Sequence, residues 1–154
     1  MTLDGVTVRP ARLEELAVAG DLRARMALED GHTWDDEAPG WRTRFAEFFR
    51  EKQSRGDAQV FFAERDGTPI GMAAFSVLDE YRAHAFGQPR GWVNSVYVVP
   101  DLRRRGIARE LMLAGIEWLR RRGCVMARLR TSDAGESLYE SLGFKRGREM
   151  ELEL

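Results

Sequence analysis

The chain alternates short apolar runs with longer segments in which apolar residues recur every three or four positions. The short runs predict β-strands, since strand side chains point alternately to two faces. The first strand, residues 6–9, ends at Pro10, which has no N–H to donate to a neighbouring strand. A tight hairpin turn is expected at Asp66-Gly67. After residues 6–9, the predicted strands are residues 59–64, 69–78, 91–99 and 125–129, and an alternating segment that ends the chain.

The longer segments have the apolar spacing of amphipathic helices. The first helix is expected over residues 13–28, with a break at Gly20-Asp21 left open, and residues 29–40 are expected to form an acidic loop. The second helix runs from Trp41 to near Gly56. Its aromatic stripe is interpreted as core packing, and its members are Trp41, Phe45, Phe48 and Phe49.

Two further helices complete the pattern. The third begins at Gly106 and ends in arginines before Gly123, where positive charge suits the C-terminal end of a helix. The fourth is expected to be capped by Ser132 or Asp133 and to end at Gly143. The order β-α-α-β-β-β-α-β-α-β predicts an α/β (α+β mixed) fold, with a central mixed, mostly antiparallel β-sheet flanked by α-helices.

Composition excludes several classes. The 154 residues suit one domain, residues 1–154, and 24 basic against 25 acidic side chains give a net charge of −1. A dedicated nucleic-acid binder has a strong basic excess, so no nucleic-acid partner is expected. The single cysteine, Cys124, cannot form an internal disulfide, and we expect a core thiol in a cytoplasmic protein. With two histidines, no signal-like start and no apolar run of roughly 18 residues, we expect no metal and no membrane partner.

One stretch, VNSVYVVPDLRRRGIARELM, concentrates charge and backbone donors. A strand ends at Pro100, a loop with Arg103, Arg104 and Arg105 follows, and a helix begins near Gly106. The first amides of a helix lack intrahelical acceptors and lie at the positive end of its dipole, and a glycine lets a ligand approach the backbone. The loop therefore predicts an anion site, for which a diphosphate is a good match.

A run of arginines is more often solvated surface. Between Asp101 and Arg130, however, nine arginines accompany three acids in a nearly neutral chain, which favours a polyanionic ligand. The sequence contains neither a GxxxxGK[ST] loop nor a GxGxxG motif after a strand, so nucleotide hydrolysis and hydride transfer lose support.

Two motifs carry a family resemblance. Arg103-x-x-Gly106-x-Ala108 after a strand resembles the [QR]-x-x-G-x-[GA] acetyl-coenzyme A (acetyl-CoA) signature of the GCN5-related N-acetyltransferase (GNAT) family. SLYESLGF, residues 137–144, resembles the C-terminal LYxxxGF motif of the same family. Both lie on the predicted elements in the family order, and the element order is similar to the family fold over nearly the whole chain. This sequence departs from the family pattern at Ala108, where a second glycine is more usual, and at Ser132, where many members carry asparagine.

The resemblance implies an acetyl-CoA-dependent N-acetyltransferase that transfers an acetyl group directly to a small-molecule amine or an amino terminus in a ternary complex. Backbone groups of Val96 and Val98 would pair with the pantetheine arm, and amides between Arg104 and Arg109 would surround the pyrophosphate. Tyr139 stands at the position of the family's frequent general acid, with a buried packing role as an equal alternative. The residues implied for cofactor binding are Val96, Val98, Arg103, Arg104, Arg105, Gly106, Ile107, Ala108, Arg109 and Ser132.

The sequence identifies no general base. Asn94 and Ser95 on the central strand are candidates to hold a relay water. The acids in residues 29–37 would suit a cationic amine, with Trp34 or Tyr81 facing its charge. Ordinary loop chemistry is an alternative for every one of these groups. The remaining loop candidates are His32 and His84.

Two alternative functions remain. A non-catalytic acyl-CoA sensor of the same fold would keep the cofactor motif without turnover. A nucleic-acid-binding module would use the arginine cluster, but the sequence has no helix-turn-helix, zinc or RNA-motif signature. Dimers are frequent in the resembled family, so a homodimer is also left open.

Overall fold

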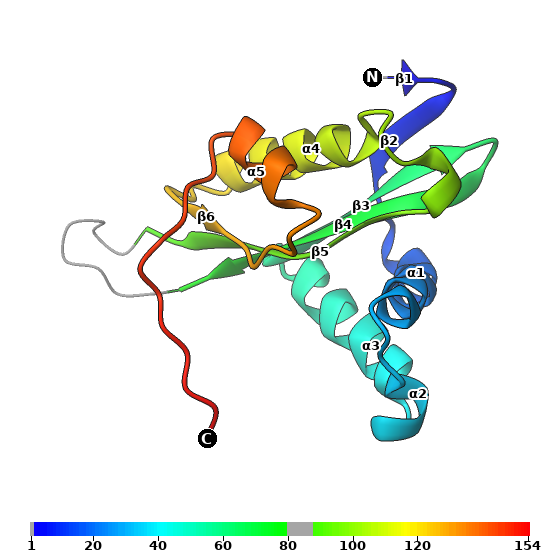
Figure 1. The fold of residues 1–154 in the computed structure, drawn as a ribbon, viewed down its shortest axis with the longest axis horizontal. Coiled ribbons are helices and arrows are strands. Elements are labelled where there is room, and N and C mark those ends of the chain that lie inside the picture. Colours follow the sequence, from blue (N-terminus) through cyan, green and yellow to red (C-terminus); the bar gives the residue numbers. More distant parts are fainter. Residues whose placement is uncertain (1, 80–87) are drawn as a thin grey trace.

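The computed structural model of the chain describes residues 2–79 and 88–154, which form a single six-stranded sheet flanked by helices (Figure 1). The strands lie in chain order across the sheet, and neighbours pair antiparallel except for the parallel pair β5 and β6. The predicted fold class and its β-α-β crossover are thus confirmed. The strands are β1 (Thr2–Leu3), β2 (Val6–Pro10), β3 (Ala58–Arg65), β4 (Thr68–Leu78), β5 (Arg90–Val98) and β6 (Ala127–Arg128).

Helices cover both faces of the sheet. In Figure 1, α4 and α5 lie above the strands and α1, α2 and α3 below them. No helix in the described part of the chain is long and apolar enough to cross a membrane. The helices are α1 (Leu16–Glu29), α2 (Trp34–Glu37), α3 (Trp41–Ser54), α4 (Ile107–Arg121) and α5 (Glu136–Ser141), with 3-10 turns at Leu13–Glu15 and Pro100–Leu102.

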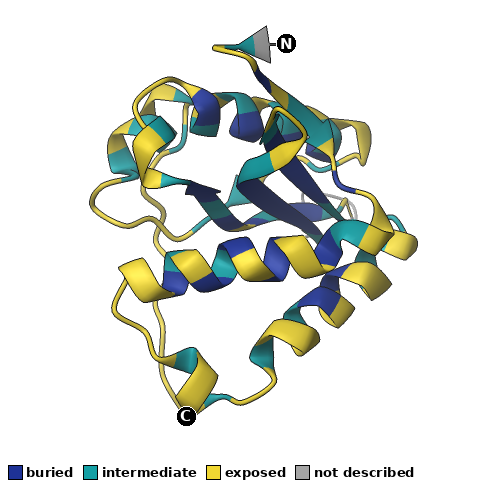
Figure 2. Cartoon of the chain, turned by 90° about the vertical axis from the view of Figure 1, so that its right-hand side faces the viewer, coloured by how far each residue is buried: buried dark blue, intermediate teal, exposed yellow. Residues whose placement is uncertain are grey.

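The central strands β3 and β4 are apolar at nearly every position because helices cover both of their faces. Phe62 and Met72 pack in the core on the α1 and α3 side, whereas Phe61 and Phe75 pack in the core on the α4 side. All four side chains are at most 5% exposed, and Figure 2 shows the buried strands between the helix layers. The sheet is therefore a rigid plate between two apolar cores.

Helix α4 approaches the sheet most closely at Gly115. A Cβ atom at this position would stand 1.9 Å from Cζ of Phe75 on β4, far inside van der Waals contact. Glycine is needed there because a side chain would push the helix away from the strand. The contact sets the height of α4 above the sheet and, with it, the place of the loop that precedes the helix.

The strongest local signals of the sequence are confirmed. The turn between β3 and β4 is at Asp66 and Gly67, whose φ angles of 51° and 77° are both left-handed, as a tight hairpin requires. Helix α1 continues through Gly20-Asp21 without a break. Gly20 is buried against α3, where its Cβ would lie 3.4 Å from the Arg42 carbonyl oxygen. This glycine thus serves helix packing.

The acidic segment between the first two long helices contains a helical turn, α2, where the sequence predicts only a loop. The Thr33 hydroxyl donates to the Glu37 carboxylate at 2.8 Å, and the Ala38 N–H donates to the Trp34 carbonyl at 2.8 Å. Acidic side chains in the first turn stabilise a helix start. Four residues are too few for a periodic apolar pattern to reveal.

The end of the chain also differs from prediction. Residues 125–129 yield only the two-residue β6, and residues 144–154 form no strand. Met150 and Leu152 are more than four-fifths exposed, and the segment is linked to residues 128–130 by the ion pairs Arg128–Glu149 and Arg130–Glu151. Alternation produces a strand only beside a partner edge of adequate length, and β6 offers too little.

Candidate active site

Strand β5 has one paired edge and one edge that is mostly open. It pairs with β4 along its length, whereas its described pairing with β6 involves only its first residues. On the β4 side, the Val99 N–H donates to the Ile70 carbonyl oxygen at 2.9 Å. By the two-residue period of a strand, the N–H and C=O groups of Val96 and Val98 therefore point to the open edge. Consistent with this direction, the Val98 carbonyl accepts a hydrogen bond from Arg103 Nε at 2.7 Å.

Residues 103–109, the arginine loop, follow β5 and carry unused backbone donors. Arg104 (φ 61°) and Gly106 (φ 84°) are left-handed, as in the backbone nests that bind anions. Gly106 is the N-cap of α4. None of the N–H groups of residues 104–109 donates to an acceptor in the described chain. These amides and the positive end of the α4 dipole form a site suited to an anion.

The first arginine of the loop is already engaged. Arg103 Nη2 lies 2.9 Å from both carboxylate oxygens of Glu29, at the end of α1. Its guanidinium also lies 5.4 Å from the centroid of the Tyr97 ring. Burial raises the pKa of the Tyr97 hydroxyl, and a hydrogen bond with Glu29 adds to the shift. Arg103 thus fastens the loop to β5 and α1.

The other arginines of the loop are exposed. Arg105 lies 4.0 Å from Asp4, and Arg109 Nη1 donates to Ser141 Oγ at 3.1 Å, which ties the start of α4 to α5. Arg104 forms no ion pair with any residue that the structure describes. Next to these charges the loop is anchored by apolar side chains, the buried Ile107 and the half-buried Ala108.

Tyr139 and Ser132 lie in and before α5. The half-buried Tyr139 packs on the α4 side of the sheet, with its ring centroid 5.9 Å from that of Phe144. Burial raises the pKa of Tyr139, so its hydroxyl is protonated at neutral pH. Ser132 is exposed, and its carbonyl accepts from the Gly135 N–H at 3.1 Å. Because this turn precedes the helix, the N-cap is Gly135, and the expected cap by Ser132 or Asp133 is wrong.

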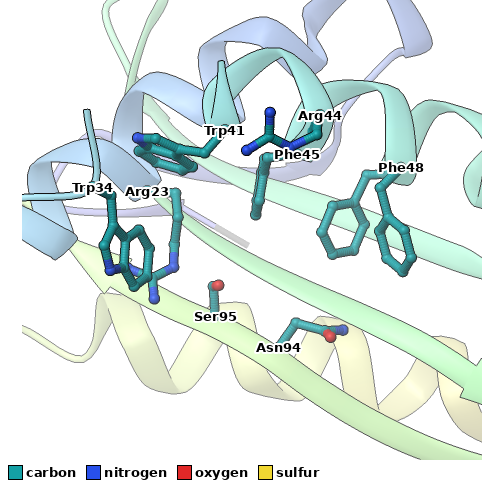
Figure 3. Close-up of a pocket in the computed structure, with 9 residues that line it drawn as sticks. Arg23, Trp34, Trp41, Arg44, Phe45, Phe48, Asn94 and Ser95 are labelled. Carbon is teal, nitrogen blue, oxygen red and sulfur yellow. The ribbon is translucent and has the colours of Figure 1, made fainter. Parts of the chain in front are cut away.

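An open groove of about 490 Å³ lies between β5 and the helices α1, α2 and α3 (Figure 3). Aromatic side chains of α3 project toward β5, and Arg23 of α1 and Trp34 of α2 lie together at one end. The described lining contains two arginines and no acid. It consists of Arg23, Trp34, Trp41, Arg44, Phe45, Phe48, Phe49, Asn94 and Ser95.

A β-bulge brings two polar side chains of β5 into the groove. The pairing passes from Ala74 with Ser95 to Phe75 with Val93, so Asn94 is an extra residue on β5. Asn94 and Ser95 consequently both line the groove, although regular alternation would send one of them to the α4 face. The bulge places polar groups beside the open edge of β5.

The aromatic stripe of α3 is only partly core. Phe49 is 3% exposed, but Phe48 is 50% exposed, and Trp41 and Phe45 are half-buried. The interpretation of the stripe as core packing is therefore wrong for Trp41 and Phe48, whereas Phe45 packs against the core and also lines the groove. The stripe is wider than the surface that α3 buries, and Arg44 within it was the available signal that part of it faces an open groove.

None of the acidic residues between positions 29 and 37 is among the described residues that line the groove. Asp35 pairs with Arg42 at 2.7 Å and accepts from Trp41 Nε1 at 3.0 Å, and the Arg42 hydrogen bond lowers the pKa of Asp35. Glu29 is held by the arginine loop. The expectation that these acids receive a cationic amine is thus wrong for this groove.

The aromatic residue expected to face a substrate cation covers a cation of the protein instead. The Arg23 guanidinium lies 4.6 Å from the Trp34 ring centroid, and His32 stacks on Trp34 at 4.9 Å. Sequence reasoning missed Arg23 because an arginine within an amphipathic helix is ordinarily surface. Tyr81 and His84, the other loop candidates, lie outside the described residues.

Cys124 is half-buried, and burial raises the pKa of its thiol, which disfavours the thiolate needed by a nucleophile. Across residues 2–79 and 88–154, no three His, Cys, Asp or Glu side chains gather in a group that could hold a metal ion.

Comparison with known proteins agrees with the motifs. A model of the acetyltransferase (GNAT) family matches residues 26–144. Mycothiol acetyltransferase of Thermobispora bispora is 34% identical over 143 residues, which are 91% of this chain and 45% of that protein. Aminoglycoside N(6')-acetyltransferase type 1 of Salmonella typhimurium is 30% identical over 88 residues, 55% of this chain and 61% of that protein. The chain thus spans about half the length of the mycothiol acetyltransferases that it matches.

Solved structures share the fold. A GCN5-related N-acetyltransferase from Ralstonia eutropha superimposes with a TM-score of 0.84 at 24% identity, covering 97% of this chain and 99% of that chain. A predicted acetyltransferase from Clostridium acetobutylicum, solved with acetyl-CoA, gives a TM-score of 0.86 at 21% identity, covering 97% and 95%. The match to the family model, over most of the chain, and the fold agree: this chain belongs to the acetyltransferase (GNAT) family.

Proposed function

We propose that the protein is an acetyl-CoA-dependent N-acetyltransferase that acetylates a primary amine by direct attack in a ternary complex. The observation that carries this proposal is the open edge of β5. It has the arginine loop at its C-terminal end and the aromatic groove beside its bulge. A donor laid along that edge and an acceptor in the groove would meet at β5. Two groups of relatives named as acetyltransferases support the same activity.

The arginine loop and the β5 edge would hold the donor. Acetyl-CoA, when bound, supplies an activated acetyl thioester. The free amides of residues 104–109 fit a diphosphate because each can donate to a different oxygen. Backbone groups of Val96 fit the pantetheine arm as an added strand would. The loop arginines 103, 104, 105 and 109 add positive charge, and the exposed Ser132 offers a contact from the α5 side.

Two donors would assist the transfer itself. The Val98 N–H points to the open edge, where it can donate to the carbonyl oxygen as negative charge develops there during attack. Tyr139 would protonate the leaving thiolate and would then regain its proton from solvent. The raised pKa of Tyr139 keeps its hydroxyl protonated. A thiolate whose conjugate thiol has a pKa of about 8.5 leaves more easily when a nearby donor gives it a hydrogen bond or a proton.

The attacking amine must also lose a proton. Since the described lining of the groove has no carboxylate, water is the proposed carrier. Asn94 Nδ2 donates to Ser76 Oγ at 2.8 Å, so the Asn94 carbonyl oxygen and the Ser95 hydroxyl remain to hold such a water. The proton would pass through this water to solvent.

The proposal is tested by measuring thiol release from acetyl-CoA across a panel of amines, with product identified by mass spectrometry. Turnover of any amine at a saturable rate is expected. Cys124→Ala should keep full activity, because direct transfer needs no acyl-cysteine. Loss of activity in a folded Cys124→Ala variant would contradict direct attack and favour a route through an acyl-cysteine.

The lack of a carboxylate base in the described groove favours a second candidate, a non-catalytic acyl-CoA sensor. Calorimetry separates the two. Tight binding of acetyl-CoA with no turnover of any amine would support the sensor function and contradict the proposed enzymatic function.

A further inference from the structure

Among the charged side chains described in the groove, Arg23 has the fewest hydrogen-bond and ion-pair partners. It extends from the middle of α1, half-buried, against Trp34. Its Nη1 atom is shielded from solvent and has no hydrogen-bond partner among the described residues. A buried donor without an acceptor costs free energy, so its place invites a ligand oxygen.

Other arginines around the groove contrast with Arg23. Arg44 donates from Nη1 to the Pro39 carbonyl at 2.9 Å, and Arg42 holds Asp35 in an ion pair. Arg23 has neither kind of contact with any residue in 2–79 or 88–154, and Asp30 acts on it only through space. Burial lowers the pKa of Arg23, yet arginine stays charged in proteins. A permanent cation is therefore held at the groove without a directly bonded anion among the described residues.

The charge of the groove limits what it can accept. Its described lining contributes two guanidinium groups and no carboxylate. A polycationic acceptor such as an aminoglycoside would be repelled there. A ligand with one carboxylate would pair with Arg23, whose planar fork matches a carboxylate in two parallel hydrogen bonds.

The rest of the lining indicates the body of the ligand. Trp34, Trp41, Phe45 and Phe48 present aromatic surface over one side of the groove, while Asn94 and Ser95 lie opposite on β5 (Figure 3). An apolar or aromatic body would cover the rings and displace water from them. The amine would then lie by the polar pair, next to the open edge of β5.

We propose that the acceptor is an amine that also carries a carboxylate and an apolar or aromatic body, with the carboxylate bound by Arg23. Free hydrophobic amino acids and similar amino-carboxylates belong to this class. The inference rests on the proposed function for the role of the amine. The carboxylate site itself is independent of turnover.

The test compares amines that differ only in the carboxylate. The pairs are phenylalanine with 2-phenylethylamine and leucine with 3-methylbutylamine, and kanamycin is a polycationic probe. Binding to the protein loaded with coenzyme A is followed by tryptophan fluorescence, because Trp34 and Trp41 line the groove, and kcat and KM are measured where turnover occurs. The carboxylate member of each pair should bind at least about tenfold more tightly.

Arg23→Gln should remove this preference by raising Kd and KM for the carboxylate member about tenfold while leaving kcat nearly unchanged. Comparing the same amines on two proteins cancels differences in amine basicity. Arg23→Lys should restore part of the preference through its charge. Arg25→Gln is the matched control, since Arg25 is exposed on the same helix and is not among the groove lining.

Equal binding within both pairs, or tighter binding of kanamycin, would overturn the proposal, as would no binding of any carboxylate. An effect of Arg23→Gln that is the same for both members of a pair would assign Arg23 a structural role instead. If carboxylates bind through Arg23 but no amine is acetylated, the carboxylate site stands and only the enzymatic function fails. Circular dichroism of each variant verifies folding.

Discussion

Two sets of arginines in this molecule have opposite surroundings. In the arginine loop the charged groups are exposed, adjacent in sequence and next to free backbone amides. In the groove, Arg23 and Arg44 come from different helices and stand among aromatic rings, with one nitrogen of Arg23 cut off from water. The loop suits a hydrated polyanion that many donors share, whereas the groove suits a single small anion stripped of water. The surroundings of an arginine, more than its charge, decide which anion it selects.

Tyr139→Phe is expected to have the largest effect on the loop side of this comparison. Removing the proposed acid should lower kcat at least about 100-fold but leave the KM of the amine unchanged, because the groove lies on the other face of the sheet. Tyr97→Phe is a control with another tyrosine whose pKa burial raises. Steady-state kinetics measures both. Full kcat in Tyr139→Phe at every pH would eliminate the general acid.

The dependence of the wild-type kcat on pH above neutrality also tests the role of Tyr139. Burial raises the Tyr139 pKa above its ordinary value, so the hydroxyl should not ionise, and kcat should not fall on that account, until the pH exceeds about 10. The same sign applies to stability: the contribution of neutral Tyr139 is complete below the unfolded pKa and is lost as pH rises through the folded one. A fall of kcat near pH 8 that Tyr139→Phe abolishes would contradict this.

Gly115→Ala should displace α4 and the arginine loop but leave the aromatic groove on the other face of the sheet unchanged. The new Cβ overlaps Phe75, so the free energy of unfolding should fall by about 1–3 kcal/mol, measured by urea denaturation. Coenzyme A affinity should drop with it, since α4 carries the loop. Gly147→Ala, at a glycine with open space around it, should leave both unchanged. An unaltered unfolding midpoint in Gly115→Ala would disprove the close contact.

Gly106→Ala and Gly123→Ala change glycines at the two ends of α4 with similar φ angles of 84° and 82°. They differ in that a Cβ at Gly106 would also lie 3.3 Å from Leu3 Cδ2. Both should lose about 1 kcal/mol of stability through left-handed strain. Only Gly106→Ala should also weaken coenzyme A binding, by about tenfold, as measured by calorimetry. Equal affinity for coenzyme A in the two variants would show that the backbone at Gly106 does not contribute to coenzyme A binding.

Glu29→Gln tests the one ion pair that, among the described residues, joins the α1 layer to the arginine loop. The Arg103–Glu29 pair is partly exposed to solvent, so its loss should cost only about 0.2–1 kcal/mol, and the difference from wild type should shrink in high salt. Thermal melts at two ionic strengths would measure it. A loss that salt does not reduce would show that the pair acts as a buried contact.

The sequence predicts most of the fold because its signals are local. The Asp66-Gly67 turn, the periodic α3 and α4 and the continuous apolar β3 and β4 each depend on neighbours along the chain. The same holds for the loop side of the site, since Arg103, Gly106 and Ala108 lie within six residues. A motif of this kind keeps its meaning before any tertiary structure is known.

The groove could not be predicted in this way. Arg23, Trp34, Phe45 and Asn94 meet only after α1, α2 and α3 pack on the sheet, and the bulge at Asn94 depends on pairing register, which alternation does not encode. The partner of Arg103 lies 74 residues away along the chain. The last predicted strand failed for a related reason, because an alternating segment does not specify its partner edge.

The unpaired edge of β5 also has a consequence for handling the protein. Backbone groups of Val96 and Val98, which have no strand partner on this edge in the described part of the chain, form a template on which an extended peptide from another molecule can add. Occupation of that edge by coenzyme A would close the template. We therefore expect the ligand to protect the protein from strand-mediated aggregation during concentration and storage, a benefit separate from its chemistry.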